Sequence, residues 1–351
     1  MGVTLVSGFC PRQCAQTCVS LSLIHAMLGP MRILMQWFSR NLCLLVVTVL
    51  CPQLRAQERP SISAPVAPKS QAASQKVPSS VRIISDVTYC TGGGHPLLMD
   101  LYLPNKFPHA VPAVLWLHGG GWRNGDKKNS WIVIKLAERG LVAASANYRL
   151  IGEAGFPAAI EDAKCAVRFL RANADQYGID PERIGIAGLS AGGHLAMLAA
   201  TAPASANLEG SGGWAKVSSR VSAVLSWYGP TDFSVGPTAF ERGHGPSIKD
   251  FLGGTPEENP ENYKNASPIH WVRKGDPPLL MIHGQDDTTV PFDQSLRMEK
   301  AYRAAGNSAK LIPVRNAGHN FESVPGKRIS PSARKIKRLS VTFLLKTLGC
   351  R

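Results

Sequence analysis

Apolar residues along this chain fall into short continuous runs separated by longer, helix-like patterns. Short apolar runs bounded by turn residues predict strands that are buried on both faces. Such runs occur at Ala113–Leu117, Ile184–Ala187 and Pro277–Ile282, and Val221–Tyr228 and Lys310–Val314 are two further predicted strands. Strands of this kind, separated by helices, predict a parallel sheet.

The segments around these runs complete the predicted architecture. Pro157–Tyr177 carries apolar residues at helical spacing and is predicted to be one amphipathic helix. Pro96–Leu103 is predicted to be one early strand. The order of elements therefore predicts an α/β fold with a mostly parallel central sheet and helices on both faces. Pro203–Lys274 is long and irregular, and we expect part of it to form a small cap region over the carboxyl edge of the sheet.

One predicted strand leads directly into a Gly-x-Ser-x-Gly sequence. Gly188 and Gly192 flank Ser190, and small residues compatible with a helix follow at once. A serine on such a sharp strand-to-helix turn is lifted clear of the sheet, and the helix N-terminus behind it offers unpaired N–H groups to negative charge. The pentapeptide alone is equally compatible with a turn in which Ser190 only caps the helix. Its context favours Ser190 as a nucleophile.

A second glycine-rich segment follows the predicted strand Ala113–Leu117. It reads His-Gly-Gly-Gly-Trp and spans His118–Trp122. Consecutive glycines allow the backbone to approach a ligand closely, and acyl transfer needs N–H donors for the oxygen that becomes negative. We therefore predict that the N–H groups of Gly120, Gly121 and Ala191 form an oxyanion hole.

The acid and the base of a serine nucleophile are expected after Ser190 in the chain. His319 is the single histidine beyond His283 and follows the last predicted strand, so it is the predicted base. Asp286 and Asp287 are adjacent, and either carboxylate stands after a predicted strand, where it can orient an imidazole. Asp286 has the further alternative of stabilising a turn.

Several segments together resemble one family of enzymes. They are His118–Trp122, Asn147–Leu150, Gly188–His194 and the spacing His283-Gly-x-x-Asp287-x-x-Val290-Pro291. In this combination the chain from about Val81 to Leu348 resembles α/β-hydrolase carboxylesterases. The most similar groups are the hormone-sensitive-lipase-like esterases and the bacterial acetyl xylan and feruloyl esterases, called BD-FAE-like.

The resemblance implies a fold, an acid residue and an activity. It implies the α/β-hydrolase fold, and it places the acid at Asp287. The expected activity is hydrolysis of short-chain acyl esters through an acyl-enzyme on Ser190, without a cofactor, and the substrate is a small ester or an acylated carbohydrate. Removal of acetyl or feruloyl groups from polysaccharide is the expected biological use.

Two other classes of function stay open. An amide hydrolase, either a formamidase or a peptidase, would use the same residues, and a catalytically silent binding protein would keep the fold without the reaction. Trp122 and Tyr228 are candidates for the substrate pocket, with ordinary core aromatics as the alternative.

The first 56 residues predict an N-terminal leader. A basic segment from Met31 to Arg40 and an apolar run at Leu42–Leu50 precede a candidate cleavage site ending at Ala56. We expect Met31 to be the true start and the mature protein to be secreted or periplasmic. The apolar run is short for a membrane span, so no stable span is expected after cleavage. A lipoprotein modified at Cys51 and an uncleaved anchor stay open.

Composition divides the remainder into a linker and a catalytic domain. Residues 57–80 are rich in Pro, Ser, Ala and Gln and are predicted to be a disordered linker, which leaves 81–351 as the catalytic domain. Three cysteines remain beyond the leader, Cys90, Cys165 and Cys350, so at least one thiol is free. Cys165 is expected in the core, and a Cys90–Cys350 disulfide is left open.

The chain is basic, with a formal net charge of +15. Six basic residues lie near the C-terminus: Lys327, Arg328, Arg334, Lys335, Lys337 and Arg338. They predict a solvated helix face, with attraction to acidic polysaccharide or an anionic surface as the alternative. No nucleic-acid motif and no Cys or His spacing typical of a metal site occurs, so we expect neither nucleic acid nor a metal as partner. The oligomeric state stays open.

Overall fold

The computed structural model describes residues 77–106, 109–128, 130–235 and 245–350. The chain divides into two compact units, Met1–Ser70 and Gln71–Arg351, and every described residue belongs to the second. The predicted leader, with Met31 and Cys51, and the predicted linker up to residue 76 lie outside the described residues. Within the described ranges, no helix is long and apolar enough to cross a membrane.

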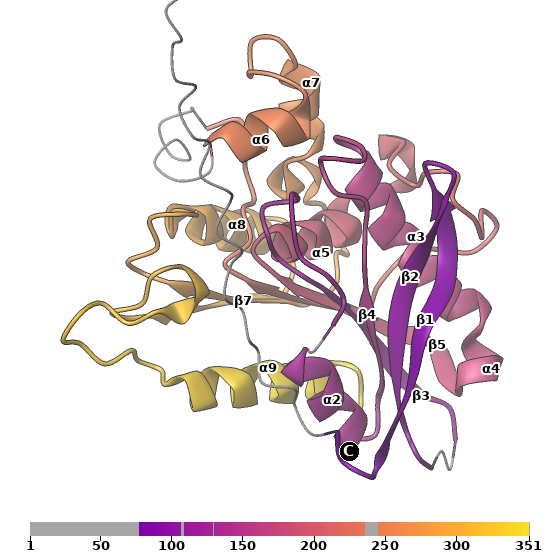
Figure 1. Cartoon of the computed structure of the whole chain (residues 1–351). Coiled ribbons are helices and arrows are strands. Elements are labelled where there is room, and N and C mark those ends of the chain that lie inside the picture. The colour runs from indigo at the N-terminus through magenta and orange to yellow at the C-terminus, as the bar shows by residue number, and fades with distance from the viewer. Residues whose placement is uncertain (1–76, 107–108, 129, 236–244, 351) are drawn as a thin grey trace, which may run out of the picture. The chain divides into compact units, whose positions relative to one another are not determined.

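An eight-stranded sheet forms the centre of this unit, in the order β1-β2-β4-β3-β5-β6-β7-β8 (Figure 1). β1 pairs with β2, and β2 with β4, in antiparallel fashion, whereas all the other neighbours are parallel. The strands are β1 (Val81–Gly92), β2 (His95–Pro104), β3 (Val111–Leu117), β4 (Val142–Ala146), β5 (Ile179–Leu189), β6 (Ala223–Trp227), β7 (Leu279–Gly284) and β8 (Ala309–Val314). The predicted α/β fold with a mostly parallel sheet is confirmed.

Helices cover both faces of the sheet (Figure 1). One face carries α2 (Trp131–Glu138) and α9 (Ala333–Thr347), and the other carries α3 (Ala158–Ala172), α5 (Ala191–Thr201) and α8 (Asp293–Ala304). The burial of β3 on both faces explains its continuous apolar run. Leu115 and Leu117 enter the core beneath α3 and α5, whereas Val114 and Trp116 enter the core beneath α2 and α9.

The predicted helix Pro157–Tyr177 is two helices rather than one. α3 ends at Ala172, and α4 (Ala174–Tyr177) follows after Asn173. The Asn173 side-chain amide donates a hydrogen bond of 2.9 Å to the carbonyl of Phe169. Asparagine competes in this way with the backbone for helix carbonyls, and this favours a helix end. The apolar periodicity alone did not reveal the break.

A disulfide joins Cys90 of β1 to Cys165 of α3, across a Cα–Cα distance of 6.3 Å. The alternative of a Cys90–Cys350 disulfide is therefore wrong. α3 packs against the face of the hairpin formed by β1 and β2, whereas Cys350 follows α9 on the opposite face of the sheet and is a free thiol. Cys165 is buried in the core, as expected.

The irregular region Pro203–Lys274 contributes to two different parts of the unit. Its described helical elements are η1 (Ala204–Ala206), α6 (Gly245–Leu252), α7 (Pro260–Asn265) and η3 (Pro268–Trp271). α6 and α7 lie together at the top of Figure 1, and Phe251 of α6 stacks on Trp122 with ring centroids 4.5 Å apart. The second half of this region therefore supplies the small cap.

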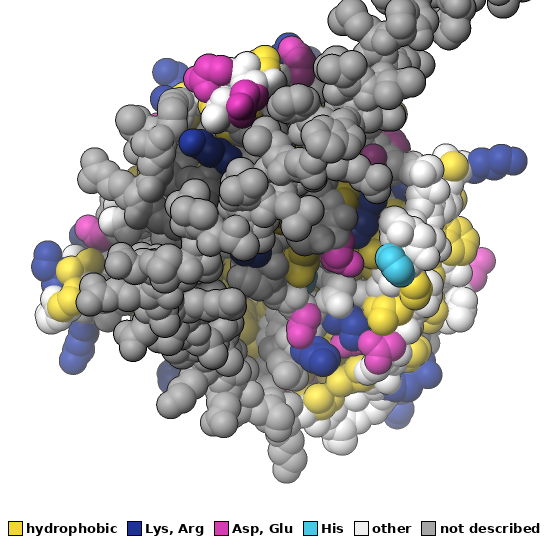
Figure 2. Space-filling view, turned by 45° about the horizontal axis from the view of Figure 1, so that its top comes forward, with side chains coloured by type: hydrophobic (Ala, Val, Ile, Leu, Met, Phe, Trp, Pro, Cys, Tyr) yellow, Lys and Arg dark blue, Asp and Glu magenta, His cyan; other side chains and the backbone are white. Residues whose placement is uncertain are grey.

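The basic residues near the C-terminus form an exposed helix face. Arg334, Lys335, Lys337 and Arg338 of α9 are all exposed, and the ammonium of Lys337 lies 4.8 Å from the centre of the Trp131 ring. On the face seen in Figure 2, basic and acidic side chains lie close to one another.

Candidate active site

Ser190 occupies the turn between β5 and α5 in a conformation that non-glycine residues rarely adopt. Its φ is 50°, and its side chain makes no capping hydrogen bond to α5. The flanking glycines are required by close packing. A Cβ at Gly188 would overlap the backbone of Gly192, and a Cβ at Gly192 would overlap the carbonyl oxygens of Leu117 and His118. The turn therefore exposes the Ser190 hydroxyl instead of using it as a helix cap.

His319 lies beside Ser190, although the two are far apart in the sequence. It begins η4 (His319–Phe321), directly after the loop that follows β8. Its Nε2 is 3.0 Å from the Oγ of Ser190, and its Nδ1 is 2.8 Å from Oδ2 of Asp287. With Nδ1–H donating to the carboxylate, Nε2 is left to accept the serine proton.

Asp287 rather than Asp286 reaches His319. Its carboxylate is fully buried, and Oδ1 accepts hydrogen bonds of 2.9 Å from the N–H groups of Thr289 and Val290. Asp286 is exposed, and the turn-stabilising bonds expected of it are made by Asp287 instead. Burial would raise the pKa of Asp287, but the hydrogen bonds from the two imidazoles of His283 and His319 hold it well below its usual value.

His283 is a site residue whose role the sequence did not reveal. It is fully buried at the end of β7, and its Nε2 lies 3.1 Å from Oδ2 of Asp287 and 2.9 Å from the carbonyl of Val290. Its Nδ1 lies 2.7 Å from the hydroxyl of Ser295. Two acceptors face Nε2, so this nitrogen carries the proton and Nδ1 accepts from Ser295. The spacing of four residues between His283 and Asp287 was the one sequence feature that could have indicated this contact.

The glycine segment after β3 runs beside Ser190. A Cβ at Gly119 would lie 3.3 Å from the Cβ of Ser190, and Gly120 has a φ of 109°, which favours glycine. Within the described ranges, no group accepts a hydrogen bond from the N–H of Gly120, Gly121 or Ala191. These are the three donors predicted for the oxyanion hole, and the structure brings all three next to the hydroxyl.

The motif Asn147–Leu150 supports this segment from behind. The Tyr148 hydroxyl donates to the carbonyl of His118 at 2.9 Å, and the two rings stack with centroids 4.3 Å apart. Arg149 is anchored by the carboxylate of Asp162, with its Nη2 2.7 Å from Oδ1. Burial lowers the pKa of His118, so its ring stays neutral in this position.

Two hollows meet at Ser190. A narrow one of about 20 Å³ is lined mainly by apolar surface, and a wide one of about 580 Å³ is lined by polar and apolar surface in about equal parts. The narrow hollow is lined by Gly121, Trp122, Ser190, Pro230, Ile248, Thr289 and Val290. Residues of the wide one include Gly120, Arg123, Asn124, His319, Asn320 and Glu322.

The two aromatic candidates are placed differently. Trp122 lines the narrow hollow, and its Nε1 donates to Nδ1 of His194 at 3.3 Å. Tyr228 lines neither hollow. It is buried, and its ring packs against that of His319 with centroids 4.6 Å apart. Tyr228 thus holds the imidazole from behind rather than contacting a ligand in either space.

The described residues contain no group of three or more His, Cys, Asp or Glu side chains arranged to hold a metal ion. The site is therefore built from the serine, the two imidazoles, the carboxylate and backbone N–H groups. Ser190, His319, Asp287 and His283 are hydrogen-bonded in this order. Such an arrangement can supply a nucleophile, a base and a carboxylate that orients the base, and unpaired backbone N–H groups can supply donors for an oxyanion.

The parallel sheet and the serine turn define the α/β-hydrolase class. A model of the BD-FAE family matches residues 99–302, more than half of the chain. The chain belongs to this family, as the resemblance implied. The matched region is an esterase domain of that class.

Curated relatives are esterases of bacteria and plants. Esterase LipC of Mycobacterium tuberculosis is 34% identical over 253 residues, which are 68% of this chain and 60% of LipC. The isoprenylcysteine alpha-carbonyl methylesterase ICME of Arabidopsis thaliana is 28% identical over 225 residues, which are 61% of this chain and 51% of that protein. The chain thus spans between half and two thirds of the length of these two relatives.

Solved structures cover the same region. A truncated carbohydrate esterase from gut microbiota is 29% identical with a TM-score of 0.66, over 76% of this chain and 96% of that one. The propionate-bound esterase Est2 of Thermogutta terrifontis is 28% identical with a TM-score of 0.63, over 78% of this chain and 96% of that one.

Proposed function

We propose that this protein is a serine carboxylic ester hydrolase that removes short acyl groups, above all acetyl, from a hydrophilic alcohol such as a carbohydrate. The observation that carries the proposal is the continuous hydrogen-bonded chain from Ser190 Oγ through the His319 ring to Asp287, with distances of 3.0 and 2.8 Å. Such a chain activates a hydroxyl for attack on a carbonyl carbon.

The reaction proceeds in two halves. Ser190 Oγ attacks the ester carbonyl carbon while Nε2 of His319 takes its proton, and Asp287 stabilises the imidazolium. The carbonyl oxygen becomes negative and accepts hydrogen bonds from the N–H groups of Gly120, Gly121 and Ala191. The tetrahedral intermediate collapses, His319 protonates the departing alkoxide, and the acyl group stays on Ser190. Water then attacks the acyl-enzyme by the same route and releases the acid.

The size of the narrow hollow supports a short acyl group. A water molecule needs about 10–15 Å³ of such space, so about 20 Å³ admits little more than one methyl-sized group. The methyl of an acetyl ester fits beside Trp122 and Ile248, whereas a feruloyl group is much larger. Within the predicted pair of polysaccharide activities, deacetylation is therefore the one that we propose.

The wide hollow supports a hydrophilic alcohol. Its lining includes the amides of Asn124 and Asn320 and the charged groups of Arg123 and Glu322, which are suited to hydrogen bonds with sugar hydroxyls. The similar protein from gut microbiota is a carbohydrate esterase, which agrees with this assignment.

Hydrolysis of p-nitrophenyl acetate, butyrate and decanoate tests the proposal directly. We expect acetate to be the best of these substrates and activity to vanish in Ser190→Ala. Ser226→Ala is the matched control, because it also loses one buried hydroxyl, which makes no hydrogen bond to any described residue. Equal and negligible rates in the wild type and Ser190→Ala would overturn ester hydrolysis and favour an amide substrate or a binding role.

Measuring acetate release from acetylated xylan tests the proposed alcohol part of the substrate. We expect acetate from this polymer and much less ferulate from feruloyl esters. Turnover of p-nitrophenyl acetate without acetate release from any acetylated saccharide would support the esterase activity and contradict a carbohydrate substrate.

We also propose that the leader between Met31 and Ala56 directs export. The Cys90–Cys165 disulfide supports this, because disulfides persist mainly in oxidising compartments. N-terminal sequencing of the protein recovered outside the cytoplasm is expected to begin at Gln57, and recovery only from the cytoplasm with an intact leader would contradict export.

A further inference from the structure

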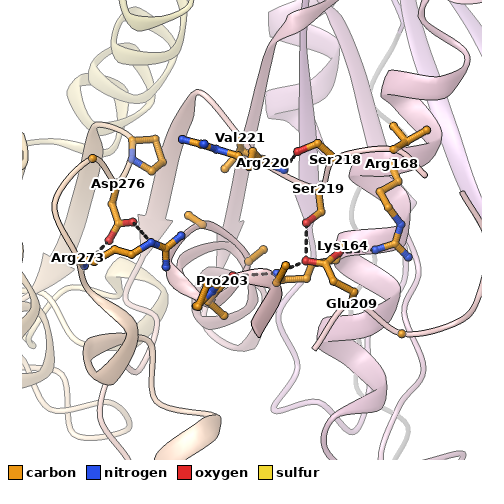
Figure 3. A pocket seen from close by; sticks show the side chains of 18 of the residues that line it. Lys164, Arg168, Pro203, Glu209, Ser218, Ser219, Arg220, Val221, Arg273 and Asp276 are labelled. Carbon is orange, nitrogen blue, oxygen red and sulfur yellow. Dashed lines mark hydrogen bonds and ion pairs between the residues drawn. The ribbon is translucent and has the colours of Figure 1, made fainter. Parts of the chain in front are cut away.

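A second large pocket lies at the opposite end of α5 from Ser190 (Figure 3). Its volume is about 510 Å³, and it is enclosed by α3, the last turn of α5, and the segments 203–221 and 273–277. α5 begins after Ser190 and has 11 residues, so its length of about 16 Å separates the pocket from the serine. No residue that lines this pocket lines either hollow at Ser190.

Positive charge predominates in the lining. Two acidic side chains, Glu209 and Asp276, face five basic ones: Lys164, Arg168, Arg220, Arg273 and Lys274. Figure 3 shows Lys164, Arg168 and Glu209 on one side and Arg273 with Asp276 on the other. The pocket therefore has an excess of cations that its own carboxylates do not neutralise.

Arg168 has an unused donor inside the protein. Its side chain is 3% exposed, its Nη1 lies 2.7 Å from Oε2 of Glu209, and its Nε donates to the carbonyl of Gly213 at 3.2 Å. Its Nη2 has no hydrogen-bond partner among the described residues. This atom has almost no exposed surface, so a molecule in the pocket does not reach it, and Arg168 contributes its positive charge to the pocket rather than a donor.

Arg220 presents a second unpaired guanidinium at the rim. The side chain is exposed and makes no hydrogen bond or ion pair with any described residue, whereas its backbone is fixed. Arg171 Nη2 donates to the Arg220 carbonyl at 2.7 Å, and the Arg220 N–H donates to the hydroxyl of Ser218 at 3.2 Å. A fixed backbone keeps the guanidinium over the pocket.

The basic residues also cap the carboxyl end of α5, but this does not account for all of them. Lys164 Nζ donates to the carbonyl of Ala202 at 2.9 Å, and Arg273 donates to the carbonyl of Thr201. Capping explains these two side chains. It leaves the Arg220 guanidinium unexplained.

We propose that this pocket binds a small organic anion through a carboxylate or phosphate group. The anion pairs with the guanidinium of Arg220 at the rim, in the geometry in which guanidinium groups bind such oxygens, and the buried charges of Lys164 and Arg168 attract it from the inner wall. The pocket is much larger than one anionic group and has room for a body the size of a monosaccharide. Sugar acids and sugar phosphates share this chemistry. The proposal does not depend on ester hydrolysis.

Burial lowers the pKa of Lys164, although Glu209 lies 2.7 Å from its ammonium. A bound anion offsets this loss of hydration and favours the charged lysine. The geometry of the cavity, its excess of cationic side chains and the unpaired Arg220 guanidinium carry the proposal, and the lysine agrees with it.

Isothermal titration calorimetry at constant ionic strength tests the proposal with glucuronate, glucose 6-phosphate, inorganic phosphate and neutral glucose. We expect at least one organic anion to bind and glucose not to bind. Arg220→Gln removes an exposed charge and is expected to weaken binding at least tenfold. Arg139→Gln, an exposed arginine outside the pocket, is expected to leave the affinity unchanged.

The outcomes distinguish a carboxylate ligand from a phosphate ligand, and they distinguish this pocket from the site at Ser190. Binding of glucuronate alone assigns a carboxylate ligand, and binding of glucose 6-phosphate alone assigns a phosphate. Unchanged binding to Ser190→Ala is expected and separates this pocket from the serine site. The proposal is overturned if no organic anion binds, or if binding persists unchanged in Arg220→Gln. Arg220 is exposed, so this variant is expected to fold and the test is decisive.

Discussion

Nε2 of His283 lies 3.1 Å from Oδ2 of Asp287, the same oxygen that lies 2.8 Å from Nδ1 of His319. One carboxylate oxygen thus faces two imidazoles. His283 is fixed on its other side by the hydroxyl of Ser295 and does not itself approach Ser190. It acts on the reaction through Asp287 and is a positioning residue.

Replacing His283 tests this relationship. His283→Gln removes the imidazole donor to the carboxylate, and we expect kcat to fall about tenfold, which corresponds to about 1.4 kcal/mol, with KM little changed. Ser295→Ala is the control, because it removes the hydrogen bond to Nδ1 of His283 and keeps the bond from Nε2 to Asp287. Steady-state kinetics with p-nitrophenyl acetate measures both. An unchanged kcat in folded His283→Gln would show that Asp287 needs no second imidazole.

Replacing Gly120 tests whether backbone N–H groups stabilise the oxyanion. Its φ of 109° and the overlap of an added Cβ with the Asn124 carbonyl force the backbone to move in Gly120→Ala. Loss of one oxyanion donor costs about 100-fold or more in kcat, and we expect a fall of this order. Gly152→Ala is the matched change, since a Cβ there meets no atom within 4 Å. Similar kcat values for the two variants would remove Gly120 from the oxyanion hole.

Ile248 tests the acyl pocket. It is 5% exposed and lines the narrow hollow beside Ser190, so Ile248→Ala lengthens the space available to an acyl chain. We expect the ratio of kcat/KM for butyrate over acetate to rise about tenfold. Val341→Ala, which removes apolar volume from the core beneath α9, is expected to leave the ratio as it is. Measuring kcat/KM of each variant as a function of acyl chain length checks this prediction. An unchanged ratio in Ile248→Ala argues against this acyl pocket.

His194 predicts a dependence of stability on pH. Burial lowers its pKa from 6.5 to about 4, so the unfolded chain binds a proton at a higher pH than the folded protein does. The free energy of unfolding therefore falls as the pH decreases from about 6.5 to about 4, by at most about 3 kcal/mol from this group. Urea unfolding of the wild type and His194→Gln at pH 7 and pH 4.5 measures the difference. Parallel changes in both proteins would contradict this role of His194.

The disulfide predicts a loss of stability on its removal. It closes a loop with a sequence separation of 75 residues, and the double variant Cys90→Ser with Cys165→Ser is expected to lose about 2–4 kcal/mol of unfolding free energy. Cys350→Ser removes the free thiol and is expected to change the stability by less than about 1 kcal/mol. Equal stability of the double variant and the wild type would show that the bond contributes nothing.

Sequence patterns predicted the fold because each central strand is buried on both faces. β3 places Val114 and Leu115 in opposite cores, and such burial leaves a continuous apolar run that is visible in the sequence. The end of α3 was missed because one side-chain hydrogen bond, from Asn173 to Phe169, sets it. Apolar periodicity carries no information about that bond.

The chain order and the glycine pattern identified the residues that meet at Ser190, but not the contacts that tune them. The choice between Asp286 and Asp287 depended on resemblance, because neighbouring residues in a loop differ only in direction. The role of His283 and the position of Tyr228 behind His319 depend on three-dimensional packing. The anion pocket was also invisible, because its basic residues come from segments that meet only in the folded unit.

The strand β8 stands at the edge of the sheet and has a neighbour, β7, on one side only. His319 depends on the loop that follows this strand, where the N–H of Asp286 donates to the carbonyl of Ala317 at 3.0 Å. Edge strands open before the centre of a sheet does, because fewer hydrogen bonds and less buried surface hold them. Gradual heating therefore separates the base from the serine while the central strands are still paired, and loss of turnover precedes global unfolding.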